Sequence, residues 1–153
     1  MYKRQFTQRI KASPERVFPL LCPVREAEWL DGWTYELLRS ESGYAEEGCV
    51  FRTTFPGEPE TIWIVTRHDL GAGRVEFARV TAGMVATRLG IRVQAAGEAE
   101  SSVEVTYDFT ATSPAGEGLI ARRHSEDAFR KSMEWWERSM NHFLETGTIL
   151  RHP

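Results

Sequence analysis

The chain has 153 residues, a length typical of one domain, and its 41% hydrophobic and 27% charged residues exclude a disordered or fibrous protein. A formal net charge of −3 gives no basic field for a nucleic-acid backbone, so nucleic acid is excluded as a default partner. No stretch is apolar enough to span a membrane and the N-terminus has no signal-peptide core, so we expect a cytoplasmic protein.

The first elements in chain order are a strand and two short helices. Apolar and polar side chains alternate over residues 2–11, which predicts a half-buried strand. Ser13-Pro14-Glu15 then starts a helix, with Ser as the N-cap and Pro at the first helical position. Pro23 ends that helix, and a second short helix is predicted over residues 24–30.

Extended segments separated by turn residues follow the two helices. The pattern predicts six strands, at residues 33–41, 49–55, 60–68, 74–81, 84–95 and 101–111. The last is the clearest, because Val103, Val105, Tyr107 and Phe109 alternate with polar residues.

A long helix closes the chain. Ser125 followed by two acidic residues is a good N-terminus, and Gly147 is a plausible C-cap. Helical spacing defines one apolar stripe of Phe129, Met133, Trp136, Met140 and Phe143. Small residues, Ala128, Ser132 and Ser139, form a second stripe beside it. This second stripe either makes room for a ligand or allows the helix to pack closely on a sheet.

This order of elements predicts an α+β fold in which a curved, seven-stranded antiparallel sheet wraps around the C-terminal helix. A lipocalin-like barrel is the competing fold, but it would lack the paired short helices after the first strand. The chain resembles the START/Bet v 1-like superfamily (SRPBCC, polyketide cyclase/dehydrase-like) in the entry Ala12–Phe18 and in its Trp-bearing last helix. Two further segments, Cys22–Trp33 and Ser42–Phe51, resemble a poorly characterised bacterial branch of that superfamily. The resemblance covers nearly the whole chain, from the strand at Tyr2 to the helix ending near Gly147, and implies one ligand-binding domain, residues 1–153, with the helix-grip fold.

The resemblance implies a cavity between the curved sheet and the last helix. Aromatic residues on several predicted elements would line it, although filling of the core is the alternative role for any one of them. The candidate ligand-binding residues are Trp29, Trp33, Trp63, Phe77, Arg79, Tyr107, Ser132, Trp136 and Met140. Arg79 shares the parity of Val75 and Phe77. It therefore either points into the cavity, where it would hold an acidic or phenolate group, or reaches water at the rim.

Catalytic signals in the sequence are weak. His68-Asp69 at a strand end would orient a general base, or would form a turn. The other histidines, His124, His142 and His152, are expected to face solvent. Metal-ligand spacing, nucleophile motifs and phosphate-binding loops are absent, so no metal or cofactor is predicted. Cys22 and Cys49 are expected to be free thiols.

The sequence therefore favours a non-catalytic protein that binds a small hydrophobic or aromatic molecule, such as a lipid or a polyketide-like compound. One alternative is an enzyme resembling polyketide cyclases and aromatases, for which His68, Arg79, Tyr107 and Ser132 are the candidate residues. Another is an interaction domain resembling Hsp90 activators, which would use an exposed apolar patch. A monomer and a dimer are both compatible with the sequence.

Overall fold

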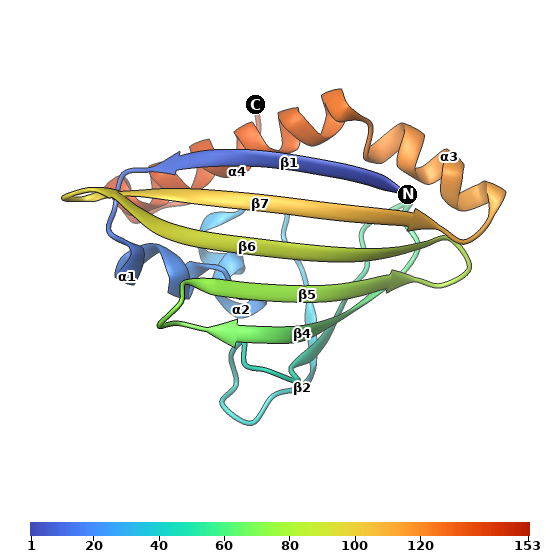
Figure 1. The fold of residues 1–153 in the computed structure, drawn as a ribbon, viewed down its shortest axis with the longest axis horizontal. Helices are drawn as coiled ribbons and strands as arrows, with labels where there is room; N and C mark the ends of the chain where they lie inside the picture. Colours follow the sequence, from blue (N-terminus) through green and yellow to red (C-terminus); the bar gives the residue numbers. More distant parts are fainter.

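A computed structural model of residues 1–153 shows one antiparallel sheet with helices on one side (Figure 1). The strands lie in the order β1-β7-β6-β5-β4-β3-β2. Their bounds are β1 (Tyr2–Ile10), β2 (Glu36–Arg39), β3 (Val50–Thr53), β4 (Thr61–Asp69), β5 (Arg74–Thr81), β6 (Val85–Gly97) and β7 (Glu100–Ala111). The predicted seven-stranded helix-grip fold is confirmed, with β2 shorter than expected because Trp33 and Tyr35 lie in the loop before it.

Two short helices follow β1, as predicted. Ser13 is the N-cap of α1 (Pro14–Val17), and a 3-10 turn, η1 (Phe18–Leu20), continues it. Helix α2 (Pro23–Trp29) begins with Pro at its first position. Pro19 and Pro23 lack the N–H that a continuous helix would need, which explains the break into short pieces.

The long helix α4 (Glu126–Thr146) has the predicted caps. The Ser125 hydroxyl accepts a hydrogen bond from the Ala128 amide, and Gly147 adopts the left-handed conformation with φ 73°. The apolar stripe is buried at Phe129, Met133, Trp136 and Met140. No helix of the structure is long and apolar enough to cross a membrane.

Helix α4 also protects the exposed edge of the sheet at β1. The amide of Arg9 donates to Glu137 Oε2 at 2.6 Å and that of Lys11 to Asn141 Oδ1 at 2.8 Å. The Gln8 amide group reaches the carbonyl of Met133 in the helix backbone, at 3.1 Å. The first two bonds satisfy backbone N–H groups at the end of β1 that an edge strand would otherwise offer to another chain.

Helix α3 (Pro114–Arg123) was not predicted. Its sequence contains two glycines and only two buried aliphatic side chains, so the sequence shows no apolar residues at helical spacing that would predict a helix here. The helix forms because its first turn docks on the turn between β5 and β6. The Thr112 amide donates to the Met84 carbonyl at 2.8 Å, and the Ser113 hydroxyl donates to the Gly83 carbonyl at 2.6 Å.

Candidate functional site

A cavity of about 710 Å³ lies between the inner face of the sheet and α4. Its floor comes from β3 to β7, and its roof comes from α4 through Ser132, Met133 and Trp136. Residues of α2, of the loop that follows it and of the end of α3 complete the lining, and the cavity is open to solvent there. The volume is in the range of cavities that enclose a drug-sized molecule.

Seven of the nine sequence-predicted ligand residues line this cavity: Trp33, Trp63, Phe77, Arg79, Tyr107, Ser132 and Trp136. The structure places the other two, Trp29 and Met140, in the core. Both are 0% exposed, and Trp29 packs on Trp136 with 5.8 Å between the ring centres. Trp29 is held there because its indole N–H donates to the Leu20 carbonyl, whereas Met140 lies one turn beyond Trp136 on α4.

The aromatic wall of the cavity is fixed by hydrogen bonds and ring contacts. Trp63 stacks on Phe51 at 5.2 Å, meets Phe77 edge-on at 6.0 Å and donates its indole N–H to the Thr53 hydroxyl. The Trp33 indole donates to the Pro23 carbonyl at 2.9 Å. These bonds hold the rings of Trp33 and Trp63 in place, whereas the buried indole N–H of Trp136 has no partner in the chain.

Arg79 occupies the centre of one side of the cavity. In the sheet it lies opposite Trp63 on β4 and Thr87 on β6, so its side chain points inward with those of its neighbours. Its guanidinium carbon lies 4.9 Å from the ring centre of Trp63, 5.2 Å from that of Tyr107 and 5.8 Å from that of Phe109. Of the two orientations left open by the sequence, the structure has the inward one.

Glu26 is a cavity residue that the sequence analysis missed. It projects from α2, and burial raises the pKa of its carboxyl from 4.5 to about 8. The carboxyl is therefore protonated at neutral pH, where it can donate a hydrogen bond or a proton to a ligand. The only sequence signal was its position on the short helix three residues before the buried Trp29.

Replacing Glu26 with glutamine should remove a pH dependence of stability. Between pH 4.5 and 8 the folded protein keeps a proton that the unfolded chain has released. The free energy of unfolding of the wild type, measured relative to Glu26→Gln, should therefore fall as pH rises through this window and level off above pH 8. Urea denaturation of both proteins at several pH values measures the difference, and parallel curves would contradict the raised pKa.

His124 lies inside the site, and the expectation that it faces solvent was wrong. Its ring stacks on Phe109 with 4.5 Å between centres. Burial, together with the positive charges of Arg79, Arg123 and Arg4, lowers the pKa of His124 to about 3. The imidazole is therefore neutral and available as a hydrogen-bond partner over the whole physiological range.

His68 does not line the cavity; its ring packs beside Phe18 at 5.2 Å. Asp69 accepts a hydrogen bond from the Ala72 amide at 3.0 Å and so stabilises the turn between β4 and β5. The pair therefore forms a turn, which is the second of the two roles considered from the sequence. Cys22 and Cys49 are both free and buried.

Two ion pairs hold the mouth of the cavity. Arg123, at the end of α3, pairs with Glu58 in the loop between β3 and β4. Arg151 and the His152 amide bind the carboxylate of Asp31, at 2.8 Å and 3.0 Å, so the C-terminal tail lies over the loop after α2. The His152 ring stacks on Trp135 with 4.1 Å between centres.

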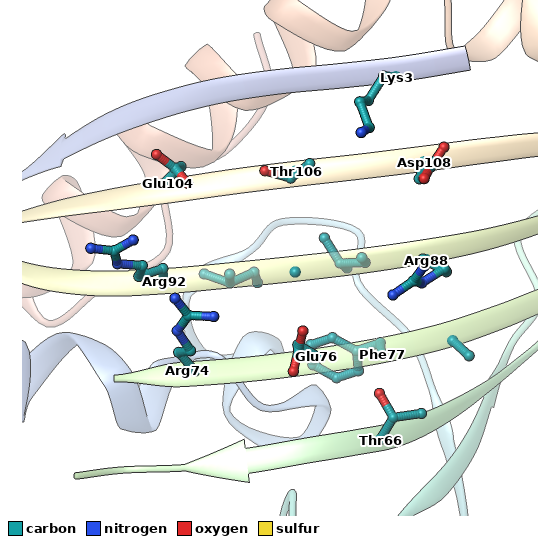
Figure 2. Close-up of a pocket in the computed structure, with 14 residues that line it drawn as sticks. Lys3, Thr66, Arg74, Glu76, Phe77, Arg88, Arg92, Glu104, Thr106 and Asp108 are labelled. Carbon is teal, nitrogen blue, oxygen red and sulfur yellow. The ribbon is translucent and has the colours of Figure 1, made fainter. Parts of the chain in front are cut away.

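A second hollow, of about 660 Å³, lies on the outer face of the sheet (Figure 2). Side chains of both charge signs line it: Lys3, Arg74, Arg88 and Arg92 against Glu76, Glu104 and Asp108. Arg88 and Arg92 of β6 both point to this outer face. A mixed-charge, open face of this kind is typical of solvated sheet surface, whereas the inner cavity combines an apolar wall with a few converging polar groups, as ligand sites do.

No protein-family model matches the chain, and no curated protein is found to be similar to it. Solved structures do match. Norcoclaurine synthase from Thalictrum flavum aligns at a TM-score of 0.71 and 13% identity, over 95% of this chain and 87% of that one. The di-domain ARO/CYC protein BexL from the BE-7585A biosynthetic pathway aligns at 0.67 and 13%, over 95% of this chain and 47% of its own. An HSP90 activator from Plasmodium falciparum aligns at 0.60 and 11%, over 95% and 94%.

These similarities show that the chain has the Bet v 1-like (SRPBCC) helix-grip fold. At this level of identity they carry no further conclusion, because one fold hosts many functions. The function has to be argued from the cavity itself.

Proposed function

We propose that the protein binds a small hydrophobic or aromatic molecule in the cavity between the sheet and α4. The observation that carries this proposal is the cavity of about 710 Å³ with Trp33, Trp63, Phe77 and Trp136 in its wall. Well-packed interiors contain few voids larger than a water molecule, so an apolar space of this size is consistent with a site kept open for a ligand. Norcoclaurine synthase, which has the same fold, is solved in complex with dopamine and hydroxybenzaldehyde.

The test uses a neutral fluorescent probe, N-phenyl-1-naphthylamine, and a variant that fills the cavity. Leu89 lies between Phe77 and Tyr107 on the floor of the cavity. The larger ring in Leu89→Trp would occupy the centre of the space. We expect the wild type to bind the probe saturably. Leu89→Trp should bind the probe with an affinity that is lower by about tenfold or more.

Arg88→Trp is the matched control, because the neighbouring residue points to the outer face of the same strand (Figure 2). It should leave probe binding unchanged. Circular dichroism and thermal melting verify that both variants fold. Absence of binding to the wild type, or equal binding by wild type and folded Leu89→Trp, would contradict the proposal.

An enzymatic role is the second candidate, favoured by the protonated Glu26 carboxyl in the same cavity as Tyr107. Groups with strongly shifted pKa values in a cleft are typical of proton-transfer sites. Native mass spectrometry of a bound compound before and after incubation distinguishes the two candidates, since a binding protein returns its ligand unchanged.

A further inference from the structure

We propose that the ligand is a small aromatic acid, whose anionic group binds the guanidinium of Arg79 while its planar body lies against the tryptophan wall. This inference rests on the proposed function and goes beyond it by giving the ligand a charge and an orientation. The anion is defined by its chemistry: a carboxylate, sulfonate or phenolate that accepts hydrogen bonds in the plane of a guanidinium.

Arg79 has no anionic partner within the chain. It is part of none of the ion pairs, and no acceptor in the chain takes its N–H groups. The guanidinium carbon lies over the rings of Trp63, Tyr107 and Phe109, but these rings offer its N–H groups no oxygen acceptor. Arg79 is half-buried, so its guanidinium has lost part of its hydration without gaining an acceptor in the chain, and a ligand anion would offset that loss.

The histidine in the site does not neutralise Arg79. His124, which stacks on Phe109, has its pKa lowered mainly by burial and further by the positive charges of Arg79, Arg123 and Arg4. Its imidazole is neutral, and its protonated form would be a second cation. Arg79 therefore lies in a mainly apolar cavity, where a cation attracts an anion more strongly than it would in water.

The carboxylates that line the cavity are committed elsewhere. Glu58 pairs with Arg123, and Asp31 pairs with Arg151. Glu26 is protonated and therefore uncharged at neutral pH, so it supplies no negative charge to Arg79. No carboxylate of the chain therefore neutralises Arg79 inside the site.

Tyr107 adds a second donor next to the guanidinium. Burial raises the pKa of its hydroxyl, which stays protonated, and no other group of the chain hydrogen-bonds to it. The guanidinium carbon lies 5.2 Å from the centre of the Tyr107 ring, so the hydroxyl is a second donor in the same part of the cavity. Trp33 and Trp63 meet edge to face with 6.3 Å between ring centres, and the flat part of the ligand would lie against the wall that they form.

Two probes that differ mainly in charge test the proposal: the anionic 8-anilinonaphthalene-1-sulfonate and the neutral N-phenyl-1-naphthylamine. We expect Arg79→Met to weaken binding of the sulfonate by about tenfold or more, the usual cost of a lost charge-assisted bond. Binding of the neutral probe should stay the same or become tighter. Arg79→Lys, which keeps the charge, should retain part of the preference for the sulfonate.

Arg88→Met on the outer face of the sheet is the matched control and should change neither affinity. If Arg79→Met affects both probes equally, or affects neither, the anion site is wrong while the hydrophobic cavity remains supported by the neutral probe. If the wild type binds neither probe, the proposed function fails first and this inference fails with it. Thermal melting of each variant verifies that loss of binding is not loss of fold.

Discussion

Replacing Gly116 with alanine is expected to lower the free energy of unfolding by about 3 kcal/mol, even though alanine is the better helix former. A Cβ atom at this position would lie 1.8 Å from the carbonyl oxygen of Met84 and 2.7 Å from its carbonyl carbon. Both are backbone atoms of the turn that α3 docks on, so neither can move aside. Urea denaturation of the variant and the wild type measures the loss.

Gly118→Ala in the same helix is the control. Its Cβ would meet only the end of the Arg122 side chain, at 3.3 Å, which is free to shift. We therefore expect the opposite sign, a gain of about 0.5–1 kcal/mol from helix propensity. Equal effects of the two substitutions would show that α3 is not packed on the β5–β6 turn.

Trp29→Ala should cost about 3–5 kcal/mol of stability, the usual range for deleting a large buried aromatic side chain. The ring is 0% exposed and stacks on Trp136, and its loss also leaves the Leu20 carbonyl without its indole donor. Chemical denaturation measures the change. A Trp29→Phe variant should lose less, because it keeps most of the ring and only the hydrogen bond disappears.

Trp135→Ala provides the comparison on α4, since this half-buried ring contacts the tail residue His152 instead of the core. It should cost about 1 kcal/mol or less. If Trp29→Ala were no more destabilising than Trp135→Ala, Trp29 would not be a core residue and the original hypothesis of a ligand contact would return.

Much of the fold could be predicted from local patterns. Alternation over residues 101–111 anticipated β7 (Glu100–Ala111), and the Ser125 and Gly147 caps anticipated the ends of α4. Helix α3 was missed although Ser113-Pro114 repeats the Ser-Pro signal that correctly identified the start of α1 at Ser13-Pro14. The glycine that allows α3 to dock also weakens the helical pattern, so only the tertiary contact explains the helix.

The site was less predictable than the fold. Strand parity placed Phe77 and Arg79 on one face, but the rings that contact the guanidinium come from strands far apart in the sequence. Glu26 and His124 carry no sequence pattern that distinguishes them from solvated residues. Their burial arises from the curvature of the sheet and from the unpredicted α3, and both depend on the complete tertiary structure.

The position of β1 has a consequence for how the chain is made. Its only partner in the sheet is β7, where Tyr2 lies opposite Phe109, and the helix that covers its edge follows later still. β1 precedes the other six strands in the sequence and yet pairs only with the last of them, and contacts so distant in sequence slow folding. During synthesis β1 should therefore stay unpaired until β7 has been made, and over that interval its backbone is open to pairing with another chain.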